Sequence, residues 1–358
     1  MTTPAPIDIA PSPWLAEPSW SVATTLEPPP PPYRTRYRLA TVLLCLTFLT
    51  STTLGAMLYL VTRTDETTSL PWLLAPETVR AVWTTPRLLR FGLSFSLPLL
   101  VILGSHELGH FLTCRRYRVP STAPYFLPAP LGIGTFGAFI RIRARINSKR
   151  QLFDIGIAGP IAGFVALVPF LVLGVAWSTP AMVAMTPEPS AVLLYRPGTN
   201  LAIHLLTLVF HGRLPASVVL DFHPFALAAW VGMLATALNL LPMGQLDGGH
   251  ILYSVAGHLH RRIAWATWLV ACALGFWWLG WLLISLMVLL LMGLRHPPVV
   301  DADQPLDRRR RRLAAVALAI FVLCFTPIPM DILTVQDSPG VLVRAPIAAL
   351  PARGNAPS

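Results

Sequence analysis

The chain has 358 residues, of which 54% are apolar and only 12% are charged, and its formal net charge is +11. Soluble domains carry about 25% charged residues, so this composition excludes an ordinary soluble enzyme and indicates a polytopic membrane protein. The Arg residues gather at the ends of apolar runs, where they orient a membrane protein and contact anionic lipids. No nucleic-acid-binding module accompanies them, so we expect no nucleic acid partner.

The four cysteines lie singly in apolar stretches and predict neither disulfides nor a thiolate metal site.

The chain begins with a segment, residues 1–33, that is rich in Pro, Thr and Ser and predicts a disordered or polyproline-II arm. Long apolar stretches follow, and each approaches or exceeds the roughly 20 residues that cross a bilayer. They cover about residues 39–61, 88–114, 153–177, 225–241, 263–294 and 313–330. We therefore expect a membrane-embedded domain at residues 34–330, with its core at about 88–300, and a weakly structured tail at 331–358.

The number of spans depends on residues 263–294, which could form one long helix or a hairpin of two short spans that turns near Gly275–Gly280. With the hairpin and a cytoplasmic N-terminus, the cytoplasmic segments carry more than twice as many Lys and Arg residues as the opposite segments. The positive-inside rule favours this arrangement. The predicted fold is an all-α polytopic membrane protein with about six to seven transmembrane helices.

Two segments modify this helical pattern. Residues 125–142 mix Pro, Gly and short apolar pieces, which is typical of a re-entrant loop or hairpin that is buried in protein or lines a cavity. We expect a short re-entrant β-hairpin-like segment there. In the next apolar stretch, Gly156, Gly159 and Gly163 have a spacing that lets another helix pack closely.

A polar motif stands near the end of the second apolar stretch, where ionisable groups are costly and usually face a partner or a wet cavity. His106 and His110 are four residues apart, so on a helix they share one face and can bind one metal ion. Glu107 lies beside them, placed to act on a metal-bound water and not as a ligand. Zinc proteases use two histidines, a third protein ligand and an open position for water. The alternative is a pair of buried histidines held by hydrogen bonds.

Asp247 is the candidate for the third ligand. It follows the fourth apolar stretch on the same side of the membrane as the end of the second, and carboxylate oxygen is a normal zinc ligand. Pro242 can break the helix and turn Asp247 inward, while Gly248 and Gly249 permit close backbone approach. The alternative interpretation of this Asp-Gly-Gly segment is a surface turn.

Other residues are less suitable as the third ligand. Cys114 lies about 12 Å beyond His106 along a helix and cannot share its metal. His258 and His260 stand beside Arg residues and are interpreted as interfacial histidines. The histidines between residues 178 and 224 fall on the opposite side of the membrane in the predicted topology.

The two polar segments together resemble a known family. His106–His110, followed by Asn239–His250, is similar to the paired signature of site-2 proteases, the intramembrane zinc metalloproteases. Val119–Gly163 resembles in particular the branch that contains bacterial and plant-chloroplast members. The resemblance covers about residues 100–300 and adds little for the N-terminal arm or the final apolar stretch.

This resemblance implies that one Zn²⁺ per chain is held by His106, His110 and Asp247, with Glu107 as the general base. It also implies that Asn239 binds the substrate carbonyl or its oxyanion, whereas the alternative role is an inter-helix hydrogen bond. The implied reaction is hydrolysis of peptide bonds in membrane-embedded protein substrates. The implied location is a lipid bilayer, which we expect to be a bacterial cell membrane with the N-terminus of this multi-pass protein in the cytoplasm.

The sequence leaves two alternatives to a protease. A family member without activity would bind membrane proteins and leave them uncut, although the intact Glu107 argues against it. A transporter or channel would use the same polar residues for ion passage, but the inverted repeats expected of a transporter are not visible in the sequence.

Overall fold

The computed structural model describes residues 37–61, 75–130, 132–144, 146–185, 193–215, 218–297, 299, 305–334 and 342–346. They all fall within one unit, Thr35–Ser358. The predicted N-terminal arm, residues 1–33, lies outside the described residues.

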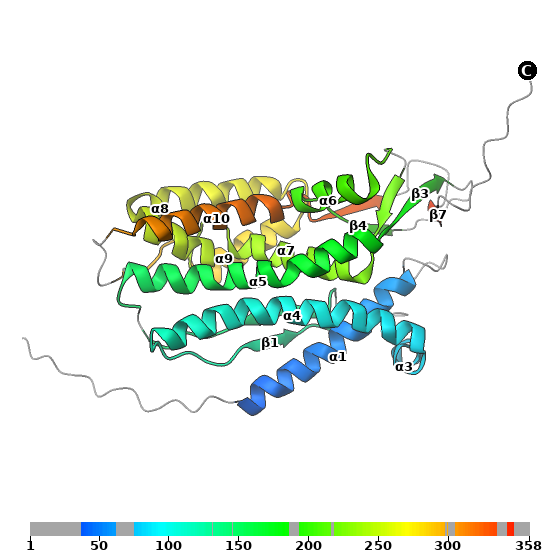
Figure 1. The fold of residues 1–358 in the computed structure, drawn as a ribbon, viewed down its shortest axis with the longest axis horizontal. Coiled ribbons are helices and arrows are strands. Elements are labelled where there is room, and N and C mark those ends of the chain that lie inside the picture. The colour runs from blue at the N-terminus through cyan, green and yellow to red at the C-terminus, as the bar shows by residue number, and fades with distance from the viewer. Residues whose placement is uncertain are drawn as a thin grey trace, which may run out of the picture. The chain divides into compact units, whose positions relative to one another are not determined.

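The described residues form mainly helices, with a few short strands (Figure 1). The helices are α1 (Tyr37–Val61), α3 (Pro76–Thr84), α4 (Pro86–Arg116), α5 (Lys149–Trp177), α6 (Leu201–His211), α7 (Pro224–Asn239), α8 (Asp247–Leu274), α9 (Gly280–Leu291) and α10 (Arg308–Cys324). The strands are β1 (Tyr125–Pro128), β2 (Thr135–Phe139), β3 (Thr179–Met185), β4 (Leu193–Pro197), β5 (Val218–Asp221), β6 (Met330–Thr334) and β7 (Leu342–Pro346).

Three of the described helices are long and apolar enough to cross a membrane, namely residues Tyr37–Leu58 of α1 and the whole of α4 and α5. At 1.5 Å per residue, the 31 residues of α4 and the 29 residues of α5 exceed a hydrocarbon core of about 30 Å. Shorter apolar helices are α6, α7 and α9.

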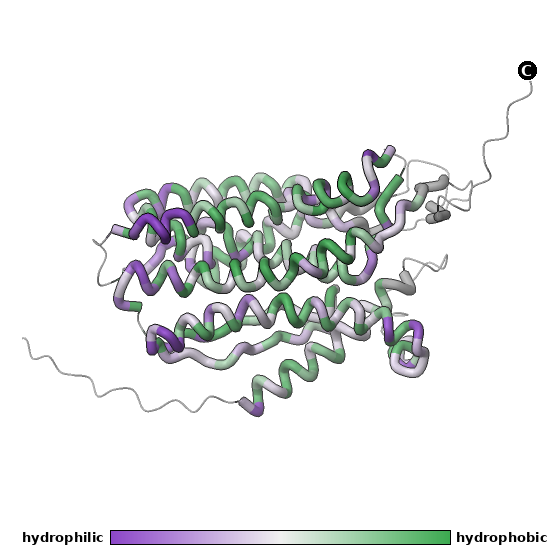
Figure 2. The backbone as a smooth tube through the Cα atoms, viewed as in Figure 1, coloured by the Kyte–Doolittle hydropathy of each residue, from purple (hydrophilic) through white to green (hydrophobic). Residues whose placement is uncertain are grey.

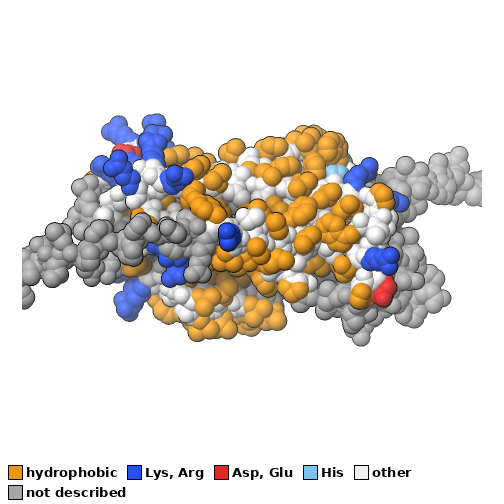
Figure 3. Space-filling model, turned by 90° about the horizontal axis from the view of Figure 1, so that it is seen from below, with side chains coloured by type: hydrophobic (Ala, Val, Ile, Leu, Met, Phe, Trp, Pro, Cys, Tyr) orange, Lys and Arg blue, Asp and Glu red, His pale blue; other side chains and the backbone are white. Residues whose placement is uncertain are grey.

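The hydropathy of the surface follows the same pattern. Figure 2 shows hydrophobic residues along α4, α5 and α10, and hydrophilic residues at the ends of these helices that lie together. Figure 3 shows apolar side chains over the middle of one face, with most Lys and Arg side chains toward its two ends. The chain is therefore a mostly helical protein whose apolar helices suit a membrane.

The apolar stretch 263–294 is divided between two helices. α8 ends at Leu274, the chain turns, and α9 begins at Gly280 in contact with α8. The helix α7 is also shorter than the predicted apolar stretch 225–241, because Pro242 has no N–H to continue α7 and Gly244 adopts a positive φ of 57°. Asp247 therefore opens the new helix α8 after a turn.

The core lies where α4, α5 and α7 pack together. Its largest fully buried apolar side chains are Phe95, Leu99, Ile102, Phe153, Leu167 and Met233. The close packing predicted for the glycines of α5 is confirmed, because Gly159 and Gly163 lie directly against side chains of α4. On α4 itself, a Cβ added to Gly109 would lie 2.5 Å from the carbonyl oxygen of Ala158, so the two backbones approach closely.

β1 and β2 form an antiparallel pair in the region where the sequence predicts a hairpin-like segment. Tyr125 pairs with Phe139, and Gly134 in the connecting turn has a φ of 83° that favours glycine. The Thr50 hydroxyl of α1 donates to the Gly134 carbonyl oxygen at 2.7 Å. α1 and α4 both contact this pair of strands.

The other strands form two small antiparallel sheets, with orders β5-β3-β7 and β4-β6. β3 begins at Thr179, directly after α5, so its sheet lies at the opposite end of α5 from Lys149 and Arg150 (Figure 1). β6 and β7 fall in or beside the C-terminal tail, for which the sequence indicates little regular structure.

Candidate metal centre

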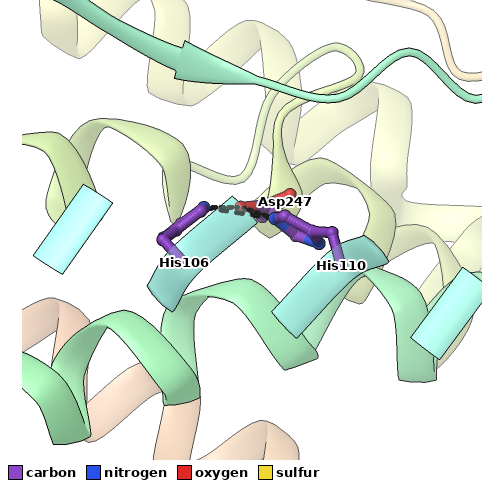
Figure 4. A group of neighbouring side chains, drawn as sticks. All are labelled: His106, His110 and Asp247. Carbon is purple, nitrogen blue, oxygen red and sulfur yellow. Dashed lines mark hydrogen bonds and ion pairs between the residues drawn. The ribbon is translucent and has the colours of Figure 1, made fainter. Parts of the chain in front are cut away.

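Two histidines and one carboxylate meet at the buried face of α4. His106 and His110 lie one helical turn apart, and their Nε2 atoms are 3.1 Å apart. Asp247 at the start of α8 reaches both rings, with Oδ2 3.2 Å from His106 Nε2 and 3.3 Å from His110 Nε2 (Figure 4). The fold thus brings together three donors that the sequence separates into two distant segments.

The spacing of these donor atoms fits a zinc ion. With zinc–ligand bonds of about 2.0–2.1 Å, two donors of a tetrahedron lie about 3.3 Å apart. The observed separations are 3.1, 3.2 and 3.3 Å. Two imidazoles and a carboxylate are a normal donor set for catalytic zinc and leave the fourth position free for water or substrate.

The α5 helix shapes the histidine side of this centre. A Cβ on Gly159 would collide with the His110 ring, and a Cβ on Gly163 would lie 3.1 Å from His106 Cβ. His110 Nδ1 donates to the Ile155 carbonyl oxygen at 2.7 Å. In the neutral ring the proton is then on Nδ1, so the lone pair of His110 Nε2 faces the centre.

The turn between α7 and α8 shapes the carboxylate side. A Cβ on Gly248 would overlap the Leu240 carbonyl oxygen, and a Cβ on Gly249 would lie 2.5 Å from the Gly244 carbonyl oxygen. Both glycines thus allow the close backbone approach that the sequence predicts. This tight turn directs the Asp247 side chain toward α4.

The centre is shielded from solvent. His106, Glu107 and His110 are 6%, 6% and 7% exposed, and Asp247 is half-buried. Ionisable groups at this depth need partners of opposite charge or a metal ion. Across the described ranges, His106, His110 and Asp247 form the one group of three His, Cys, Asp or Glu donors this close together.

The two predicted catalytic residues both lie beside the donors. Glu107 follows His106 on α4 and is buried, and α4 contacts β2. Asn239 is the last residue of α7, and its Nδ2 lies 3.4 Å from His106 Nε2. This contact links α7 to α4 and places the Asn239 amide next to the donor set.

Several other histidines lie apart from the three donors. His211 bonds to the Val175 carbonyl oxygen at the far end of α5 from Ile155. His258 is exposed on α8, but His260, interpreted from the sequence as interfacial, is buried and 3% exposed. The ring of His260 lies near that of His296, a residue that the sequence did not single out.

Helices suited to a membrane and a buried His-His-carboxylate centre beside a glutamate define a helical membrane protein with a metalloprotease-like site. A family model described as Peptidase family M50 matches residues 94–275, which is half of the chain and contains every residue of the centre. The chain belongs to this family. It is an integral membrane protein of the site-2 protease type.

Plant proteins are among its relatives. The chain is 28% identical over 256 residues to "Probable zinc metalloprotease EGY2, chloroplastic" of Oryza sativa subsp. indica, covering 68% of this chain and 44% of that protein. It is 30% identical over 233 residues to "Probable zinc metalloprotease EGY1, chloroplastic" of Arabidopsis thaliana, covering 64% and 42%. The predicted resemblance to the branch with plant-chloroplast members is confirmed. The chain spans less than half the length of these relatives.

Proposed function

We propose that the chain is an intramembrane zinc metalloprotease that hydrolyses peptide bonds of membrane-spanning proteins. The observation that carries this proposal is the convergence of His106, His110 and Asp247 beside the buried carboxylate of Glu107. One Zn²⁺ per chain would be held by the first three residues. When bound, it would lower the pKa of a water molecule and polarise the substrate carbonyl.

The residues around the centre supply the remaining chemistry. Glu107 acts as the general base. Its carboxylate accepts a proton from the attacking water and then donates this proton to the nitrogen of the leaving amine. Asn239 donates a hydrogen bond from Nδ2 to the substrate carbonyl oxygen as negative charge develops there. The Ile155 carbonyl keeps the His110 ring in the orientation that the centre needs.

A membrane-spanning helix must unwind before it is cut, because its own hydrogen bonds cover its carbonyl groups. We infer that the β1–β2 pair is re-entrant at membrane depth and that an unwound substrate segment pairs with β2. Two observations support this role. β2 contacts α4, the helix that carries Glu107, and the β2 residues Phe136 and Phe139 are 77% and 43% exposed.

The proposed topology has six to seven spans within a domain at residues 34–330, with α8 and α9 as a hairpin. The N-terminus is cytoplasmic, and the membrane is a bacterial cell membrane. In support, the Arg-rich ends of α4 and α10 and the basic start of α5 lie together (Figure 2). His110 is about 9 Å from the end of α4, so cleavage would occur near the cytoplasmic surface.

The test compares wild-type protein with Glu107→Gln, each co-expressed with a library of single-span membrane proteins and then purified. We expect cleavage products with the wild type only, and about one zinc per chain in both proteins, because glutamine keeps the shape of Glu107 and removes the base. Equal cleavage by both proteins would contradict the mechanism. Full zinc occupancy with no Glu107-dependent product would favour an inactive, substrate-binding family member. A wild type that holds no zinc would refute the protease and leave the transporter alternative.

A further inference from the structure

The first turn of α8, which carries Asp247, has little support of its own. The residue before it, Leu246, has no side-chain oxygen to cap the helix, and Gly248 and Gly249 are poor helix formers. The Asp247 carboxylate is directed at the histidines of α4 and does not cap the helix either. A helix start of this kind frays unless tertiary contacts hold it.

Residues 292–297, which directly follow α9 and are called the connector below, contact the chain just before Asp247. The carbonyl oxygen of Gly293 lies 2.6 Å from the position that a Cβ on Gly244 would occupy. Gln245 Nε2 donates to the Met292 carbonyl oxygen at 3.4 Å. The connector is itself anchored, because its buried Leu294 belongs to the same apolar cluster as Leu241 and Met243 of the turn.

The same connector contacts the chain just after Asp247, through His296. His296 Nδ1 lies 2.6 Å from the Pro297 carbonyl oxygen, which can only accept, so Nδ1 carries a proton and the neutral ring has a lone pair on Nε2. His250 Nδ1 therefore donates to His296 Nε2, at 2.8 Å. The His296 ring also stacks on Tyr253 with centroids 4.2 Å apart and an interplanar angle of 18°.

His250 lies one helical turn after Asp247 and packs against α5. A Cβ on Gly156 would lie 3.0 Å from His250 Cβ and 3.5 Å from the Asp247 carbonyl oxygen. On α5, Gly156 directly follows Ile155, whose carbonyl oxygen orients His110, and Asp154 precedes Ile155. The first turn of α8 is therefore held between α5 and the connector.

We propose that the connector, residues 292–297, is a clasp that holds Asp247 at the metal centre, and that His296 is a positioning residue that acts through His250. The inference rests on the proposed zinc site. Without the contact between the two histidines, the first turn of α8 frays, the carboxylate leaves the histidines more often, and zinc dissociates faster.

The experiment uses the full chain, purified in detergent with zinc bound, and follows zinc release into excess EDTA. His296→Ala should release zinc about 10-fold faster or more, in line with losses seen when groups that support metal ligands are removed. His296→Gln keeps an oxygen that can accept the His250 proton and should restore slow release. His258→Ala, at an exposed position of the same helix α8, is the matched control.

A second measurement separates positioning from general destabilisation. In protein loaded with Co²⁺, the visible absorption reports ligand geometry, and it should change in His296→Ala and not in His258→Ala. Equal zinc release by the wild type and His296→Ala, or faster release that His296→Gln does not restore, would refute the clasp. A wild type that binds no zinc would refute the proposed function instead, so the two failures are distinct.

Discussion

The two sides of the metal centre are built differently. On the histidine side, both ligands belong to the single long helix α4. Glycines let α4 and α5 approach closely, and the hydrogen bond from His110 to the Ile155 carbonyl oxygen joins the two helices. On the carboxylate side, Asp247 follows a tight turn and opens a helix that has no side-chain cap. Continuous secondary structure fixes the histidines, whereas contacts between segments remote in sequence fix the aspartate.

This difference predicts how each side fails. Moving a histidine requires bending α4 or displacing α5, and both are embedded in the apolar core. Moving Asp247 requires only that one helical turn opens locally, which costs less free energy than global unfolding. The carboxylate side should therefore limit how long the centre keeps its metal.

The largest effects are expected from a methyl group placed on either side of the centre. Gly248→Ala would meet the Leu240 carbonyl oxygen, and Gly159→Ala would meet the His110 ring. Each should weaken zinc binding about 10- to 100-fold and remove activity with it. Zinc content after dialysis against buffered zinc measures the change.

Gly104 on α4 offers a matched control for these two glycine variants. A Cβ on Gly104 would lie 3.4 Å from Phe126, which is an ordinary contact, so Gly104→Ala should keep its zinc. If Gly248→Ala binds zinc as well as the wild type, the turn before α8 is more adaptable than its backbone contacts suggest. If Gly159→Ala does so, α5 does not fix the His110 ring.

The histidine side could be predicted from the sequence because its geometry is local. The spacing of His106 and His110 fixes their common face on any helix, and the apolar stretch around them predicts that helix. Asp247 required the predicted topology and the resemblance of its segment to a family, because no spacing rule links it to residues so distant. The predicted placement of Asn239 near the centre came from the same resemblance.

The support of the carboxylate side could not be predicted in this way. The hydrogen bond between His250 and His296 joins the start of a helix to a connector in a different part of the chain. Neither histidine belongs to a repeating sequence pattern that would predict this contact. The burial of His260 was not predicted either, because its neighbours Arg261 and Arg262 indicate a surface position. The short helix α3 and the strands β6 and β7 also lack a long periodic pattern.

A smaller effect is expected from Arg310, which holds the start of α5 next to Ile155. Its Nε and Nη2 donate to the Asp154 carboxylate at 2.8 and 2.6 Å, and the Tyr117 hydroxyl donates to the same carboxylate at 2.5 Å. Burial and the neighbouring Asp154 raise the pKa of the Tyr117 hydroxyl, so it stays a donor. This network ties the ends of α4, α5 and α10 together.

Arg310→Gln should therefore lower the free energy of unfolding by about 1–3 kcal/mol, because it leaves the largely buried Asp154 carboxylate without its cation. Arg309→Gln removes the adjacent, exposed arginine and should stay within about 0.5 kcal/mol of the wild type. Denaturant unfolding in detergent measures both. Equal effects of the two changes would mean that the arginine run acts only through its total charge.

The smallest effect is expected on the side of α4 that faces α1. The buried hydroxyls of Thr52 and Ser96 are 2.7 Å apart and join these two helices. Hydrogen bonds between membrane helices contribute about 0.6 kcal/mol on average, so Ser96→Ala should lower the free energy of unfolding by about that amount. Ser96 lies about 15 Å from His106 along α4, and α5 holds the histidines independently, so zinc release into EDTA should match that of the wild type. Faster release would show that α1 also supports the histidine side, and the contrast with the carboxylate side would then be one of degree.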